Sequence, residues 1–163
     1  MEIERKFLVD SLPADYEAFP HVEIEQCYLC TSPTLRVRRM GDEYIMTVKE
    51  HVATRSEAIH NREEEFRLTP EAYERLRAKC EGRPVTKTRY RIPLDGGLTA
   101  ELDVFHGHNE GLMLVEVEFP DTETADSFMP PSWFGTDVSK DKRYRNSYMA
   151  FHTTLETENG EQK

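Results

Sequence analysis

The chain has 163 residues, enough for one compact domain with its own hydrophobic core. Charged residues make up 32% of it and hydrophobic residues 37%, and the formal net charge is −10. This acidic balance argues against sequence-independent binding of nucleic acid, which requires a basic surface. The sequence shows no apolar run of about 18 residues and no signal peptide, so we expect a cytoplasmic protein without a membrane partner.

The first predicted strand covers "MEIERKFLVD", in which charged and apolar side chains alternate. Because successive side chains of a strand point to opposite faces, one face carries Glu2, Glu4 and Lys6. Ile3 and Phe7 lie on the other face. This strand alone fits both a solvated polar face and a charged site, so the later strands must decide between them.

Three further strands are predicted at residues 22–29, 34–40 and 43–50. Gly41 and Asp42 separate the last two and predict a tight hairpin turn. Cys27 in the first of these strands and Cys30 just after it have the spacing CxxC, but no second cysteine pair or histidine cluster completes a zinc site. The chain has three cysteines in all, an odd number that argues against a disulfide framework.

A strand at residues 62–68 precedes a short helix, predicted at 71–80 and ending near Gly82. Thr69 is placed to cap this helix, and Pro70 to occupy its first position.

Strands follow at residues 86–94, 98–105 and 112–119, and the turn "DGG" at 95–97 makes the first two a hairpin. The sheet is therefore expected to be mostly antiparallel.

Asp121 is expected to cap a helix that runs to about Phe128, and a terminal helix is predicted at residues 145–156. We expect one domain over residues 1–152, with residues 153–163 forming a loose tail.

Like charges recur two residues apart on most of these strands. The sets are Glu2 and Glu4; Arg36 and Arg38; Glu63 and Glu65; Lys87, Arg89 and Arg91; Glu101 and Asp103; and Glu116 and Glu118. On a single strand a solvated face is the more frequent explanation. On six strands, however, one face carries charges of nearly a single sign. This pattern indicates that the sheet closes, with its charges inside and its apolar faces packed outward against helices. Metal cations and a polyanion would then supply the partners that enclosed charges require.

These residues resemble the CYTH superfamily, also called triphosphate tunnel metalloenzymes. Residues 2–6 match its ExExK signature, and the resemblance extends over about residues 1–150 through "LRVRR", the lysine of "TVKE", "REEEF", "TKTRYRI", "AELDVF", "LVEVEF" and "RYRNSYMA". The resemblance implies an α+β fold built on an eight-stranded antiparallel barrel, or tunnel, flanked by a few helices. It also implies dependence on a divalent metal and a substrate that carries a triphosphate, as in the short bacterial inorganic triphosphatases.

The resemblance also implies roles for individual residues, which we state as expectations. The metal ligands are expected among Glu2, Glu4, Glu116, Glu118, Glu101 and Asp103. Such hard oxygen ligands suit Mg²⁺ or Mn²⁺. The phosphates are expected to bind Lys6, Arg36, Arg38, Lys49, Lys87 and Arg89. The catalytic residues are expected to be Lys6, Tyr28, Lys87, Glu63 and Glu65, with Tyr28 as a polar partner of the attacking water.

The expected activity is metal-dependent hydrolysis of inorganic triphosphate, or of another small triphosphate substrate, with release of orthophosphate. A class IV-type adenylate cyclase and a thiamine triphosphatase are alternative enzymes on the same scaffold. A non-catalytic module that binds polyphosphate is an alternative of another class. The oligomeric state is left open, with a homodimer as one option.

Overall fold

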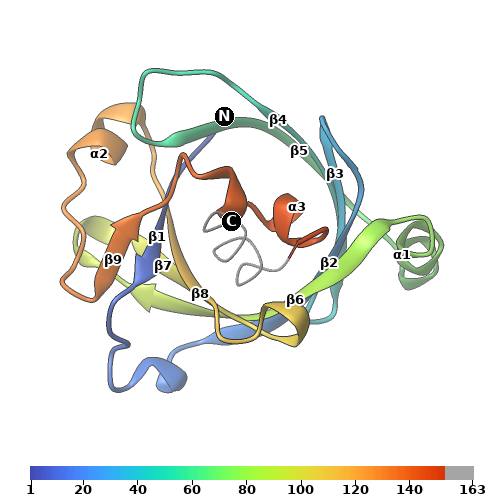
Figure 1. Cartoon of the computed structure of the whole chain (residues 1–163), viewed down its shortest axis with the longest axis horizontal. Coiled ribbons are helices and arrows are strands. Elements are labelled where there is room, and N and C mark those ends of the chain that lie inside the picture. The colour runs from blue at the N-terminus through green and yellow to red at the C-terminus, as the bar shows by residue number, and fades with distance from the viewer. Residues whose placement is uncertain (153–163) are drawn as a thin grey trace, which may run out of the picture.

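Eight strands form a closed antiparallel barrel, as predicted, in the computed structural model, which describes residues 1–152 (Figure 1). Their bounds are β1 (Glu2–Val9), β2 (His21–Thr31), β3 (Thr34–Met40), β4 (Glu43–His51), β5 (Ile59–Arg67), β6 (Glu81–Pro93), β7 (Thr99–Phe105) and β8 (Met113–Glu118). The order around the barrel is β5-β4-β3-β2-β6-β7-β8-β1, and pairing of β1 with β5 closes it. The predicted tail at 153–163 lies outside the described residues, and the predicted domain boundary stays a prediction.

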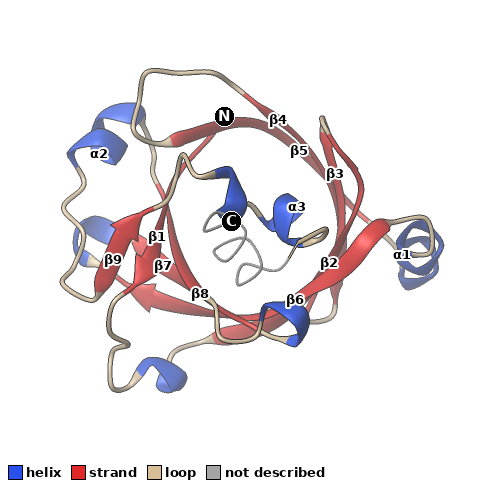
Figure 2. Ribbon diagram, in the orientation of Figure 1, coloured by secondary structure: helices blue, strands red, loops and turns tan. Residues whose placement is uncertain are grey.

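A ninth strand, β9 (Phe134–Asp137), was not predicted. It pairs with the second half of β1, whose first half pairs with β5 (Figure 2). Its sequence, "FGTD", is too short to show an alternating pattern, and Gly135 lies against the carbonyl of Leu8 and the side chain of Asp10, which a Cβ atom would displace. The strand therefore depends on a tertiary contact that local sequence does not reveal.

The helices begin as the capping residues predict. Thr69 Oγ1 accepts a hydrogen bond from the amide of Ala72 at the start of α1 (Pro70–Arg77). Asp121 Oδ1 likewise accepts one from the amide of Thr124 at the start of α2 (Thr122–Ser127). Short 3-10 turns η1 (Tyr16–Ala18), η2 (Asp95–Gly97) and η3 (Gly107–Asn109) join neighbouring elements. Within the part of the chain that the structure describes, no helix is long and apolar enough to cross a membrane.

The predicted terminal helix at 145–156 is wrong in its extent. Among the described residues it is reduced to α3 (Asn146–Met149), which follows the 3-10 turn η4 (Lys142–Tyr144). No side chain of residues 1–152 caps its first turn, and the carbonyl of Ala150 accepts a hydrogen bond from the amide of Arg83. Contact with β6 therefore overrides the helical pattern. Positions 153–156 of the predicted helix lie outside the described residues.

Apolar side chains form one cluster outside the barrel and another inside it. Outside, strand residues such as Phe7 and Val117 pack under Ala125 of α2 and Phe134 of β9, which confirms the outward apolar faces. Inside, Val85, Phe105 and Leu114 share faces with charged residues of their own strands but pack against the C-terminal segment.

We call residues 138–150 the plug. Its Val138, Tyr144, Met149 and Ala150 belong to the inner cluster, and Figure 1 shows α3 within the ring of strands. The plug fills one end of the barrel, so only the remainder of the interior is charged. This closure was not predicted.

Candidate active site

The strand register brings the charged rows together inside the barrel. Lys6 of β1 lies opposite Glu116 of β8, and Glu4 lies opposite Glu118. Glu116 in turn faces Glu101 of β7. Acidic and basic side chains from strands far apart in the sequence therefore share one interior surface, as their alternation predicts.

The run of three glutamates on β5 has the register expected from its period of two. Glu63 pairs with Lys49 of β4, and the Lys49 Nζ atom lies 3.4 Å from its carboxylate. Glu65 lies two residues further along the same face. Glu64 pairs with Val48 on the outer face, which it shares with Phe66, whose side chain is exposed. The opposite register would place Phe66 among the interior charges and Glu63 and Glu65 on the outer face.

Glutamine substitutions along this run test its catalytic role. Glu63→Gln and Glu65→Gln should each lower turnover of the substrate, because both lie on the face of β5 that carries the Glu63–Lys49 ion pair, Glu63 half-buried and Glu65 exposed. Glu64→Gln is the matched control and should leave turnover nearly unchanged. The measurements are turnover at saturating metal and melting temperature. Loss of turnover confined to Glu64→Gln would contradict the assignment.

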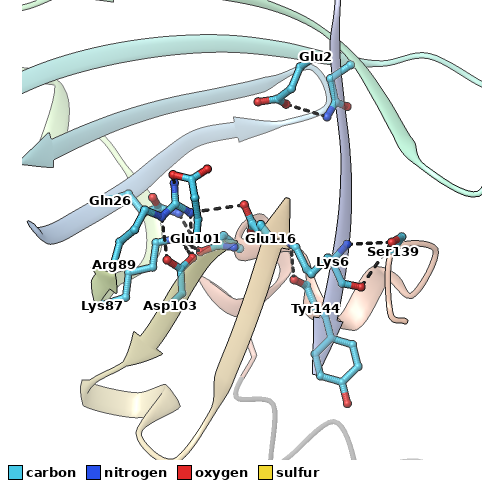
Figure 3. A network of polar contacts seen from close by, with 12 residues as sticks. Glu2, Lys6, Gln26, Lys87, Arg89, Glu101, Asp103, Glu116, Ser139 and Tyr144 are labelled. Atoms are coloured by element: carbon cyan, nitrogen blue, oxygen red, sulfur yellow. Dashed lines mark hydrogen bonds and ion pairs between the residues drawn. The ribbon is translucent and has the colours of Figure 1, made fainter. Parts of the chain in front are cut away.

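Asp103 is the centre of a buried ion-pair network (Figure 3). Arg89 donates to both of its carboxylate oxygens at 2.8 and 2.9 Å, and Lys87 Nζ donates to Oδ2 at 2.8 Å. Burial alone would raise the pKa of Asp103, but the two cations outweigh it and lower that pKa. Both oxygens of Asp103 are thus occupied by cations, which leaves little capacity for a metal.

Glu116 is similarly surrounded by cations. Lys6 Nζ and Arg89 Nη2 each lie 3.4 Å from one of its oxygens. Burial raises the pKa of Glu116, but Lys6 and Arg89 more than reverse that effect and hold it well below its usual range. Glu116 therefore acts as a counter-ion that keeps two candidate phosphate-binding side chains in the interior.

The carboxylates of Glu2, Glu4 and Glu118, in contrast, lie near other carboxylates. Burial raises the pKa of Glu4 to about 8, helped by repulsion from Glu116 and Glu2. Burial, Glu2 and Glu101 raise the pKa of Glu118. Lys49 and Lys6 offset part of this repulsion, and Lys49 Nζ lies 3.0 Å from Glu2. A divalent cation would relieve it further.

The donor set fits a hard divalent metal in its chemistry, since all three side chains offer carboxylate oxygen. Among the residues described, no three acidic, histidine or cysteine side chains are already close enough together to hold an ion. The carboxylates would therefore have to approach one another when a metal binds.

Arg36 and Arg38 are interior cations that form no ion pair among residues 1–152. The Nε atoms of both are buried and have no hydrogen-bond partner, and residues 1–152 provide neither side chain with an ion pair within 4.0 Å. Arg36 Nη2 donates to Thr47 Oγ1, at 3.3 Å. Burial lowers the pKa of Arg38 to about 10, assisted by repulsion from Arg36 and Arg89. Buried guanidinium groups require an anion, so this wall of the barrel is suited to phosphate.

Tyr28 is fully buried, and its hydroxyl oxygen accepts a hydrogen bond of 2.9 Å from Gln26 Nε2. Burial raises the pKa of Tyr28, so the phenol is protonated at neutral pH and cannot act as a base. Gln26 was not among the predicted site residues, although it occupies the same strand face. Asn146 of the plug was also not among the predicted site residues, because the sequence of the plug has no strand pattern that would place Asn146 in the interior.

Residues 1–144 match the family model of the CYTH domain. The chain belongs to the CYTH family. A CYTH relative from Nitrosomonas europaea, described as an inorganic triphosphatase, is 45% identical and aligns over 91% of this chain and 96% of its own. Another inorganic triphosphatase, from Acetivibrio thermocellus, is 36% identical over 90% of each chain.

The CYTH barrel has also been solved in a relative. The crystal structure of the inorganic triphosphatase NE1496 matches with a TM-score of 0.66 and 44% identity, over 92% of this chain and 94% of that one. Membership of this family implies dependence on a divalent metal. The roles of the individual residues stay predictions.

Proposed function

We propose that the protein hydrolyses inorganic triphosphate to orthophosphate and pyrophosphate, with Mg²⁺ or Mn²⁺ as the metal. The observation that carries this proposal is that one barrel holds both arginines that need an anion and carboxylates that need a cation. Arg36 and Arg38 have buried Nε atoms and no ion pair with residues 1–152, and Glu4 and Glu118 are carboxylates whose mutual surroundings favour a cation. A small polyanion with a divalent metal satisfies both sets, and the 45% identical relative described as an inorganic triphosphatase supports this substrate.

Glu2, Glu4 and Glu118 are the residues that would hold the metal. Glu118 is preferred over Glu116, and Asp103 is disfavoured, because Glu116 and Asp103 are each paired with both a lysine and an arginine, whereas Glu2 is paired with Lys49 alone among residues 1–152. When bound, the metal supplies positive charge to the phosphate oxygens.

The basic residues bind the substrate and stabilise the terminal phosphoryl group as charge spreads over its oxygens. Arg36 and Arg38 offer forked N–H donors, and Lys6 and Lys87 offer ammonium donors on other walls. Arg89 is held by Asp103, Glu101 and Glu116, so it contributes a fixed positive charge.

Water attacks the terminal phosphorus and the bond to the bridging oxygen breaks, so pyrophosphate leaves. Glu63 and Glu65 are the carboxylates proposed to accept a hydrogen bond from that water. Tyr28 remains protonated and serves as a hydrogen-bonding partner.

A substrate panel tests the proposed function. The protein is incubated with triphosphate, ATP or thiamine triphosphate plus Mg²⁺ or Mn²⁺, and the products are identified. Orthophosphate formed mainly from triphosphate is the expected result. Cyclic AMP with pyrophosphate from ATP would instead identify a cyclase. Binding of triphosphate without any product would identify a non-catalytic module.

Metal binding should release protons at neutral pH. The pKa of Glu4 is raised to about 8 in the metal-free protein, so below that pH its carboxyl group is mostly protonated and a metal must displace the proton. Apparent affinity for Mg²⁺ should therefore rise with pH and level off above about pH 8. Calorimetric titration at pH 7 in two buffers of different ionisation enthalpy measures the released protons. Equal heats in the two buffers would contradict the prediction.

A further inference from the structure

The plug holds both candidate catalytic lysines. Lys6 Nζ donates to the backbone carbonyl of Tyr144 at 2.9 Å, and the amide of Lys6 donates to Ser139 Oγ at 2.9 Å (Figure 3). Lys87 Nζ donates to the side-chain oxygen of Asn146 at 3.0 Å. The plug therefore contacts the charged site directly as well as filling the apolar end of the barrel.

Asn146 is the plug residue whose side chain joins two strands of the site. Its Oδ1 atom accepts a hydrogen bond from Gln26 Nε2 on β2 as well as from Lys87 on β6, each at 3.0 Å. Gln26 in turn donates to the hydroxyl of Tyr28. The side-chain oxygen of Asn146 thus fixes the position of Lys87 relative to Gln26.

The two acceptors of Lys87 determine the direction of its remaining donor. An ammonium group has three N–H bonds in tetrahedral positions. One points to Asp103 at 2.8 Å and another to Asn146, and residues 1–152 offer no third hydrogen-bond acceptor. With two directions fixed, rotation about the Cε–Nζ bond is restricted and one N–H remains, on a buried Nζ atom that lies 5.4 Å from the centroid of the Phe105 ring. This is the N–H that we assign to a phosphate oxygen. With Asp103 alone, the group could rotate.

We propose that Asn146 is a positioning residue for triphosphate hydrolysis, acting through Lys87. The inference rests on the proposed function and adds a residue beyond positions 1–144, which the CYTH family model covers. Asn146 orients the ammonium of Lys87 toward the substrate and takes no part in the bond changes itself.

A double-mutant cycle separates this role from a purely structural one. The variants are Asn146→Leu, which keeps the size of the side chain, Lys87→Ala, and the two combined. Misorientation of a reacting group costs on the order of 10- to 100-fold, so Asn146→Leu should slow hydrolysis by that factor in the wild-type background. In the Lys87→Ala background it should cause no further loss, because the group that it orients is gone.

Rates are measured in single turnovers with enzyme in excess over labelled triphosphate, so that slow variants stay within range. Ser147→Ala is the control, since the Ser147 side chain makes no hydrogen bond with residues 1–152, and it should keep the wild-type rate. Melting temperatures are recorded for every variant. Asn146→Ser, whose oxygen lies one bond nearer the backbone, is the second variant if Asn146→Leu does not fold, and the same result is expected.

An equal loss from the Asn146 substitution in both backgrounds would overturn the proposal, because the residue would then act through the packing of the plug. A wild-type rate for Asn146→Leu would overturn it as well. Failure of the wild-type protein to release orthophosphate is a different result, which would refute the proposed function and this inference together.

Discussion

Replacing Arg36 or Arg38 with alanine is expected to slow triphosphate hydrolysis by on the order of a thousandfold, the effect of a single transition-state arginine in phosphoryl transfer. The Nε atoms of both are buried, and neither side chain has an ion pair with residues 1–152, so a phosphate oxygen is the contact that we assign to them. Their contact strengthens as negative charge spreads over the terminal phosphoryl group, so kcat should fall along with kcat/KM. Stability should not fall with it, because each substitution also relieves repulsion between the two arginines.

Arg39→Ala is the matched control for both variants. Arg39 follows Arg38 directly but is exposed on the outer face, where its Nε atom donates to the carbonyl of Gly41. Its loss should change kcat and kcat/KM by less than about twofold, as is usual for surface substitutions. Steady-state kinetics on the three variants provide the comparison. Equal sensitivity of Arg38 and Arg39 would mean that the interior face of β3 is wrongly assigned.

Glu4→Gln is expected to have opposite effects on activity and on stability. It removes charge from a proposed metal ligand at nearly constant shape. Substitutions in the surroundings of metal ligands already cost roughly 10–100-fold, so turnover should fall by at least that factor. The metal-free protein, however, should become more stable at alkaline pH.

The sign of the stability effect follows from the raised pKa of Glu4. A carboxyl whose pKa is about 8 in the folded protein and near 4.5 in the unfolded chain binds protons more readily when folded. The wild-type protein therefore loses stability as pH rises from about 4.5 to about 8, and glutamine, which does not ionise, avoids that loss.

Melting temperatures in chelator at pH 5 and pH 9 measure this effect. Glu4→Gln should exceed the wild type more at pH 9 than at pH 5. Glu43→Gln is the control, because Glu43 lies exposed at the start of β4 and pairs only with the exposed Arg67. Full turnover in Glu4→Gln, or wild-type turnover that persists in excess chelator, would contradict the metal assignment.

The barrel was predictable because alternation is a local property. Each of β1 to β8 shows its interior face in its own sequence, and turns such as Gly41-Asp42 mark where the chain reverses. The plug was not predictable in this way. Its fold depends on contacts with apolar residues such as Phe105 and Leu114, which lie on otherwise charged strand faces. These residues come together to form a surface for the plug only when the barrel closes.

The residues that line the candidate site were predictable from the sequence, but the ion pairs that they form with one another were not. The sequence indicates that Glu4, Asp103 and Glu116 all face the interior, and it does not distinguish the three carboxylates from one another. Their surroundings differ because the register places lysine and arginine beside Asp103 and Glu116 but carboxylates beside Glu4. Pairing across strands depends on how the closed barrel aligns them, which no single strand encodes.

Hydrolysis of inorganic triphosphate in ¹⁸O-labelled water, with Mg²⁺ present, tests the central claim most directly. Attack of water on the terminal phosphorus predicts orthophosphate and pyrophosphate in equal amounts, with one labelled oxygen in the orthophosphate and none in the pyrophosphate. Label in the pyrophosphate would place the attack on the central phosphorus. An absence of phosphate release would contradict the account as a whole.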